Sequence, residues 1–134
     1  MKLVLDTNVL LAAFISHGMC QEVLEHCSLR HEVVISEFIL AEFQEKLTGK
    51  FRFTVTEADE SAALLRTRFT MVVPHPLDQP ICRDKDDDAI IATAIAGGCS
   101  CIITGDKDLL ALRQVGSVQV LSPSLFWAAE SRLS

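Results

Sequence analysis

The stretch DDAIIATAIAGGCSCIITGDKDLL, residues 87–110, contains the elements that decide the fold. The apolar run after its first aspartates predicts a helix, which Asp87 or Asp88 caps and a Gly-Gly pair ends. The residues CIIT, 101–104, predict a short buried strand, and Asp106 turns the chain after this strand into another helix. A helix that leads into an apolar strand, followed at once by a turn and a second helix, is typical of α/β proteins.

Short apolar strands alternate with helices over the rest of the chain in the same way. We predict strands at residues 2–5, 31–35, 71–73, 101–104 and 118–121, and helices at 9–15, 21–27, 37–47, 56–69, 88–96, 107–112 and 123–132. The strands are rich in Val and Ile without polar alternation, which indicates a mainly parallel sheet with helices on both faces. The predicted fold class is therefore α/β, a three-layer α/β/α sandwich with about five strands. Such sheets place their sites outside the carboxyl ends of the strands.

Length and composition indicate one domain that does not enter a membrane. About half of the 134 residues are hydrophobic, which is enough for one core, and we predict a single domain over residues 1–134. The apolar run at residues 9–15 is too short to span a membrane and follows the polar Asp6 and Asn8. We therefore expect no membrane contact and a cytoplasmic location.

The cysteines and histidines do not predict a site. The five cysteines are an odd number, which argues against a disulfide framework. Cys99 and Cys101 lack the usual spacing of zinc ligands, so buried free thiols are the better interpretation. The four histidines form no arrangement that we connect with a catalytic base or a metal. They are His17, His26, His31 and His75.

The net charge of −6 neither suggests nor excludes a nucleic-acid substrate. Phosphate contacts need Lys and Arg, of which the chain has 12 against 18 acids. If eight of the acids gather at one metal-binding pocket, the remaining surface carries 10 acids and 12 bases. These eight are Asp6, Glu42, Asp84, Asp86, Asp87, Asp88, Asp106 and Asp108.

Four of these acids are expected to meet at one edge of the predicted sheet. Asp6 directly follows the first strand, and Asp106 lies two residues after Thr104 at the end of the fourth. Asp88 opens the helix that leads into the fourth strand, and Glu42 lies about two turns into the helix after the second. Clustered carboxylates repel one another and therefore bind hard cations such as Mg²⁺ or Mn²⁺. Such ions promote phosphodiester cleavage by water.

Each acid also has an ordinary structural explanation. Asp6, Asp88 and Asp106 can all be helix N-caps. Glu42 lies among apolar residues and as an unpaired buried carboxylate needs a cation. It can instead reach solvent or pair with Lys46, four residues further along the helix. The metal site is therefore predicted from the convergence of all four acids.

Three segments carry these acids along the chain: LVLDTNVLLAAF at residues 3–14, VVISEFILAEF at 33–43, and DDAIIATAIAGGCSCIITGDKDLL at 87–110. Together they resemble the PIN-domain nucleases, close to the VapC-like toxins of prokaryotic toxin–antitoxin pairs. The resemblance covers nearly the whole chain. It implies a three-layer α/β/α fold, Mg²⁺- or Mn²⁺-dependent cleavage of RNA, an antitoxin protein as partner, and often a homodimer.

The resemblance also implies roles for individual residues. By position, the catalytic and metal-binding acids are Asp6, Glu42, Asp88 and Asp106, with Asp108 as a further metal ligand. The residues that would support them by hydrogen bonding are Asn8, Ser36 and Thr104. Asp88 is preferred to its acidic neighbours because it directly precedes the run AIIATAIA. The roles of Asp84 and Asp87 stay open.

The leading interpretation is a metal-dependent endoribonuclease, the toxin of a toxin–antitoxin pair, in which Arg83, Lys85 and Lys107 contact nucleic acid. A phosphatase with an aspartyl nucleophile is disfavoured, because Asn8 stands where a second aspartate is needed after Asp6. Two alternatives stay open. One is a module whose acidic pocket binds a basic segment of a partner such as an antitoxin, and the other is a nuclease acting on another nucleic acid.

Overall fold

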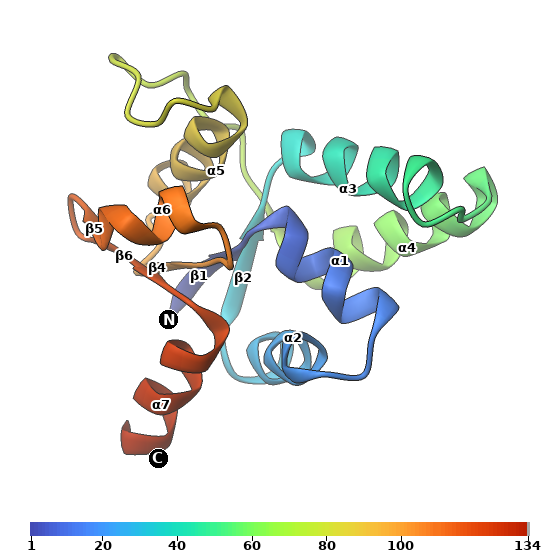
Figure 1. The fold of residues 1–134 in the computed structure, drawn as a ribbon, viewed down its shortest axis with the longest axis horizontal. Helices are drawn as coiled ribbons and strands as arrows, with labels where there is room; N and C mark the ends of the chain where they lie inside the picture. The colour runs from blue at the N-terminus through green and yellow to red at the C-terminus, as the bar shows by residue number, and fades with distance from the viewer. Residues whose placement is uncertain (134) are drawn as a thin grey trace.

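A six-stranded sheet runs through the centre of the protein in the order β3-β2-β1-β4-β6-β5 (Figure 1). Neighbouring strands are parallel, except that β5 and β6 are antiparallel. The computed structural model describes residues 1–133, and the side chains of residues 1–130. The strands are β1 (Lys2–Leu5), β2 (Glu32–Ile35), β3 (Thr70–Met71), β4 (Cys101–Ile103), β5 (Gln114–Val115) and β6 (Val118–Leu121).

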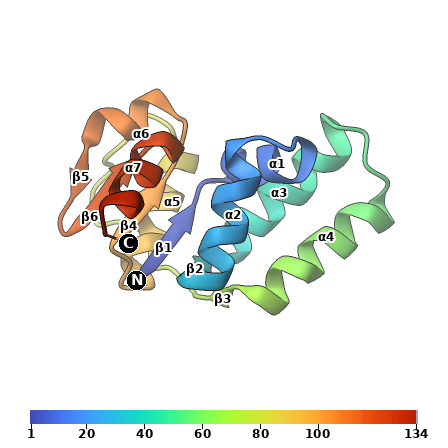
Figure 2. The same cartoon turned by 90° about the horizontal axis from the view of Figure 1, so that it is seen from below.

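Helices cover both faces of this sheet, as the sequence predicts. Those within residues 1–133 are α1 (Thr7–Ile15), α2 (Met19–Arg30), α3 (Glu37–Gly49), α4 (Val55–Arg68), α5 (Lys85–Ala96), α6 (Lys107–Leu112) and α7 (Pro123–Leu133). In Figure 1, α5 lies above the strands and α2 and α7 lie below them, and Figure 2 shows α2 and α7 from below. α1 packs against α2 and α3, and α4 packs along α3. None of these helices combines the length and apolar composition that a membrane crossing requires.

β1 and β4 form the middle of the hydrophobic core. Leu3, Val4 and Leu5 of β1 are buried, and so are Ile102 and Ile103 of β4. The two strands are paired so that Leu5 lies beside Ile103, the last residue of each strand. The chain therefore leaves the sheet at the same level on two adjacent strands, and the residues that follow these strands are brought side by side.

The structure adds one strand to the five predicted and moves another. β5 forms a short antiparallel hairpin with β6, and Gly116 in the turn has a φ of +59°, which glycine adopts without strain. Two residues are too few to give a recognisable hydrophobic pattern, so the sequence did not predict this strand. The strand predicted at residues 71–73 is Thr70–Met71, and Val73 is 85% exposed because the chain has already left the sheet there.

α4 is preceded by a capping box built on Thr54, two residues before Thr56, where we predicted the helix to begin. The Thr54 hydroxyl accepts a hydrogen bond from the backbone N–H of Glu57 at 3.0 Å, and the Glu57 carboxylate accepts one from the backbone N–H of Thr54 at 2.9 Å. This is the spacing of a Ser/Thr with a Glu three residues later. The residues before this helix, 51–54, are irregular, as predicted.

Replacing Thr54 by alanine should lower the free energy of unfolding by about 1 kcal/mol, because the backbone N–H of Glu57 loses the hydroxyl that accepts its hydrogen bond. Thr56→Ala is the matched control, since Thr56 is exposed and the structure gives it no cap hydrogen bond. The control should change stability by less than about 0.5 kcal/mol. Urea unfolding of the three proteins measures both values, and equal losses in the two variants would contradict the assignment of the cap.

Candidate active site

The candidate site begins where β1 and β4 end. Asp6 follows β1 and continues the ladder, since its backbone N–H donates to the carbonyl of Ile103 at 2.9 Å. Its side chain is only 6% exposed. The buried Thr104 hydroxyl donates to Asp6 Oδ2 at 2.7 Å and accepts from the backbone N–H of Asp106 at 2.9 Å. Thr104 therefore connects the two acids through its hydroxyl.

Two more carboxylates, those of Asp87 and Asp108, gather beside this pair. Asp87 in the first turn of α5, and Asp106 and Asp108 at the start of α6, each offer an oxygen within 4.8 Å of the others. Asp106 Oδ1 also accepts from the backbone N–H of Leu109 at 3.0 Å, so Asp106 caps α6 and belongs to the acidic group at the same time. The cap that we considered as an alternative explanation thus coexists with the cluster.

The electrostatics of the site disfavour negative charge. Burial, together with the neighbouring carboxylates of Asp106, Asp84, Asp6 and Asp108, raises the pKa of Asp87 to about 6. Burial also raises the pKa of Asp6, against the opposing effect of the hydrogen bond from Thr104. Both raised pKa values reflect acids that lie close together and are partly shielded from solvent. A cation bound there would stabilise their ionised forms.

Glu42 on α3 lies at the edge of this group. Phe38 and Ala41 of the same helix are exposed, and Glu42 is half-buried, between the enclosed and the solvent-facing positions that the sequence left open. Burial raises the pKa of Glu42, and Asp86 on α5 raises it too. The Thr7 hydroxyl and the ammonium of Lys46 lower this pKa.

Lys46 lies among the acids without making the predicted pair with Glu42. Its ammonium donates to Asn8 Oδ1 at 3.5 Å, and its charge lowers the pKa values of both Asp6 and Glu42. The exposed Asn8 therefore orients a lysine at the rim of the site. The sequence suggested Lys46 only as a possible partner of Glu42, because its place near Asn8 depends on the packing of α3 against α1.

Asp88 differs most from its predicted position. Its carboxylate accepts hydrogen bonds from the backbone N–H groups of Ile81 and Cys82, with Oδ1 at 2.8 Å from the Cys82 nitrogen. We expected α5 to begin at about residue 88, but its N-cap is Asp84, which accepts from the backbone N–H of Asp86 at 2.9 Å. Because the helix begins earlier than predicted, the Asp87 carboxylate lies in the acidic group. The Asp88 carboxylate instead binds the backbone of the preceding loop.

The other predicted residues surround this centre. Ser36 after β2 is fully buried, and its hydroxyl forms a hydrogen bond of 2.9 Å with the hydroxyl of Thr93 on α5. This bond connects the start of α3 to α5. Arg83 is exposed, and its Nη2 lies 3.2 Å from Asp108. Lys85 and Lys107, at the first residues of α5 and α6, are exposed as well.

The side chains present fit a hard divalent cation such as Mg²⁺ or Mn²⁺. The donors are carboxylate oxygens, which these ions prefer, and they come from three elements that the core holds rigidly. The Thr7 hydroxyl oxygen is buried and has no hydrogen-bond partner among the described residues, although it lies near Glu42. An unpartnered polar atom beside crowded acids is consistent with a site that binds a hydrated ion.

Comparison with solved structures shows the same fold. VapBC2 from Rickettsia felis, bound to a DNA fragment from their promoter, matches with a TM-score of 0.65 and 16% identity over 91% of this chain and 98% of that one. VapBC-1 from nontypeable Haemophilus influenzae matches with a TM-score of 0.66 and 17% identity over 92% and 99%. FitAcB from Neisseria gonorrhoeae matches with a TM-score of 0.57 and 18% identity over 91% and 98%.

Sequence comparison gives the family. No curated protein matches this chain. The family model of the PIN domain matches residues 2–108, which is most of the chain. The matched range includes Asp6, Glu42, Asp87 and Asp106, the acids of all the contributing elements. The chain therefore belongs to the PIN domain family.

Proposed function

We propose that this protein is a metal-dependent endoribonuclease and the toxin of a toxin–antitoxin pair. The observation that carries the proposal is the group of Asp87, Asp106 and Asp108, whose oxygens lie within 4.8 Å of one another beside the buried Asp6. Membership of the PIN domain family supports a nuclease. The structures of VapBC complexes among the matches support the toxin role.

The chain's own residues would do most of the positioning. We assign the metal ligands to Asp6, Asp87 and Asp106, with Asp108 and Glu42 at the edge, and Asp87 replaces Asp88 in this proposal because of where its side chain lies. Mg²⁺ or Mn²⁺ held there would supply Lewis-acid stabilisation of the phosphate and lower the pKa of water. Thr104 keeps Asp6 oriented for this task through its hydrogen bond.

Basic residues at the rim would hold the RNA backbone. Arg83, Lys85 and Lys107 lie next to the acids in sequence and are exposed, and Lys46 reaches the site from α3. Arg83 pairs with Asp108 in the free protein. A phosphate bound by Arg83, or a cation bound by Asp108, would compete with this exposed pair. These contacts would add affinity that weakens with salt.

The direct test is cleavage of a mixed pool of single-stranded RNA by the purified protein with Mn²⁺, with Mg²⁺ and with EDTA. We expect cleavage with either ion and none with EDTA, because the acids cannot activate water alone. An Asp6→Asn preparation, purified in parallel, controls for a contaminating ribonuclease. A pool of single-stranded DNA of the same sequences separates RNA from another nucleic-acid substrate.

Equal cleavage with EDTA would overturn the metal-dependent mechanism. If the folded protein binds Mn²⁺ and cleaves neither pool, the second candidate function, a module that binds a basic partner segment, takes its place. The observation that favours this candidate is the same acidic group, since an inserted Arg or Lys would pair with the carboxylates and exclude the metal. An antitoxin of this kind would also inhibit the nuclease. A homodimer and a cytoplasmic location stay predictions.

A further inference from the structure

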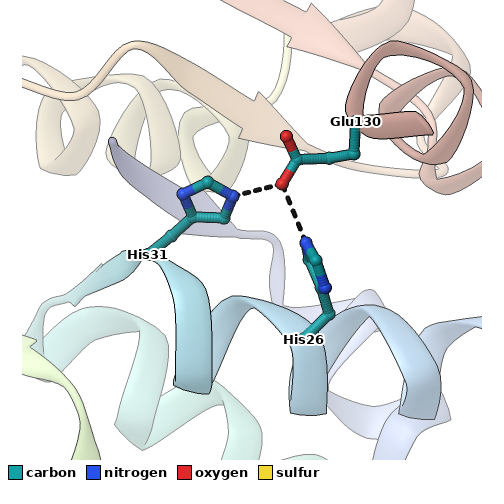
Figure 3. A group of neighbouring side chains, drawn as sticks. All are labelled: His26, His31 and Glu130. Atoms are coloured by element: carbon teal, nitrogen blue, oxygen red, sulfur yellow. Dashed lines mark hydrogen bonds and ion pairs between the residues drawn. The ribbon is translucent and has the colours of Figure 1, made fainter. Parts of the chain in front are cut away.

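A second group of metal-binding side chains lies at the other end of the sheet. His26 in α2, His31 between α2 and β2, and Glu130 in α7 point toward one another (Figure 3). Glu130 Oε1 lies 2.8 Å from His26 Nε2 and also contacts His31 Nε2. His31 precedes β2, so this group is at the amino ends of the parallel strands, whereas the acidic site is at their carboxyl ends.

Aromatic packing holds the two imidazoles in place. The ring of His26 lies 4.9 Å from that of Trp127 and 5.7 Å from that of His31, measured between centroids. Phe126 packs edge-on to both histidines, at 6.3 Å and 6.0 Å. The outer nitrogen of His31, Nδ1, lies 3.1 Å from the backbone nitrogen of Met1. The rings therefore have little freedom to turn away from Glu130.

Glu130 is a partly buried carboxylate shared by two rings. Its side chain and that of His31 are each 13% exposed, and that of His26 is 29% exposed. Burial by itself raises the pKa of Glu130, but the hydrogen bonds from His31 and His26 bring it below its ordinary value. The carboxylate is thus ionised beside two imidazole nitrogens, which is the donor set of a His₂Glu metal site.

We propose that His26 Nε2, His31 Nε2 and a Glu130 oxygen bind a divalent transition-metal ion, Zn²⁺ by preference, which joins α7 to α2. Two imidazoles and one carboxylate make the three-ligand zinc set that leaves a fourth position for water. Tetrahedral ligands about 2.0–2.1 Å from the ion lie about 3.3 Å apart. From the 2.8 Å separation of His26 Nε2 and Glu130 Oε1, these two side chains need to part by roughly half an ångström, and His31, which lies closer to Glu130, needs to move further.

The chemistry of this group differs from that of the acidic site. Nitrogen donors favour Zn²⁺, Co²⁺ and Ni²⁺, whereas the carboxylates near Asp6 favour Mg²⁺ and Mn²⁺. Burial raises the pKa of the nearby Cys27 thiol to about 12, so this thiol is protonated in the metal-free protein. Excess Mg²⁺ can therefore fill the oxygen site while the histidines remain free for a transition metal.

Trp127 makes the site measurable. It is the single tryptophan of the chain, and it packs directly on His26. Co²⁺ quenches indole fluorescence at short range, so we expect untagged protein in excess Mg²⁺ to lose Trp127 fluorescence as Co²⁺ is added, to a stoichiometry of one. Zn²⁺, which does not quench in this way, should displace Co²⁺ and restore the signal.

Three variants identify the ligands. His26→Gln, His31→Gln and Glu130→Gln keep a polar side chain at each position, and each should weaken Co²⁺ binding at least about 10-fold. His75→Gln is the matched control, because His75 is exposed in the loop before α5 and should bind no ion of this site. Circular dichroism and thermal unfolding check that each variant is folded.

Two results would overturn the proposal. If wild-type fluorescence does not respond to Co²⁺, the two histidines and Glu130 are a metal-free hydrogen-bonded clamp. If it responds equally in the wild type and all three variants, the ion binds elsewhere. Should a variant fail to fold, anomalous diffraction at the zinc edge from wild-type crystals grown with Zn²⁺ decides the question, since the peak must lie between these three side chains.

Discussion

Asp87→Asn should abolish RNA cleavage, whereas Asp88→Asn should leave most of it. Asp87 is 9% exposed and shares the acidic group with Asp106 and Asp108, so its loss removes a proposed metal ligand. Several kcal/mol of transition-state stabilisation depend on a bound metal, and a loss of about 4 kcal/mol lowers the rate about 10³-fold. We therefore expect a loss of about this size in initial rate at saturating Mn²⁺.

Asp88→Asn is the matched control because it makes the same replacement, of one carboxylate oxygen by an amide NH2 group, at the neighbouring residue. The carboxylate of Asp88 accepts hydrogen bonds from Ile81 and Cys82, and an asparagine oxygen can accept the same bonds. Its activity should stay within about 10-fold of the wild type, which is about 1.4 kcal/mol. The reverse order, an inactive Asp88→Asn and an active Asp87→Asn, would assign the metal to Asp88 and contradict our assignment.

The metal-free protein should become less stable as the pH rises from about 4 to 7. The pKa of Asp87 is about 6 in the folded protein against an ordinary 3.8, so folding favours its protonated form. Its contribution to stability is present in full below the ordinary pKa and is lost as the pH rises through about 6. One pKa unit corresponds to 1.36 kcal/mol, so we expect a loss of roughly 1 to 3 kcal/mol.

Urea unfolding with EDTA at several pH values measures this loss. The Asp87→Asn variant removes the titrating group, so the difference in unfolding free energy between variant and wild type should grow with pH. Mn²⁺ should stabilise the wild type at pH 7 and have less effect on the variant, since an ion that binds the folded state stabilises it. Asp78→Asn, in the exposed loop before α5, is the control. A constant difference across the pH range would contradict the crowding of charge at Asp87.

Much of the fold and part of the site could be predicted because they depend on local patterns. The apolar runs at β1, β2, β4 and β6 were predicted nearly residue by residue, and the place of Asp6 at the edge of the sheet follows from its position after the first strand. The prediction was less accurate where shifting the start of a helix by a few residues changes which side chain faces the site. A run of Asp84, Asp86, Asp87 and Asp88 offers several equivalent caps, and the choice of Asp84 decides which carboxylate turns inward.

The histidine group could not be predicted from the sequence for a different reason. His26 and His31 are close in sequence, but Glu130 lies about a hundred residues further along the chain. No spacing pattern links residues so far apart, and only the packing of α7 on α2 brings them together. Glu42 shows the same dependence on packing, because its burial is decided by how α3 lies against α1 rather than by its apolar neighbours in sequence.

The position of β1 next to β4 has a consequence during protein synthesis. Asp6 leaves the ribosome a hundred residues before Asp106, which at about 5–20 residues per second is an interval of about 5–20 s. Until β4 has been made and has paired with β1, the carboxylates of α5 and α6 are not held next to Asp6. A growing chain therefore has no complete acidic site until β4 and the start of α6 have been made.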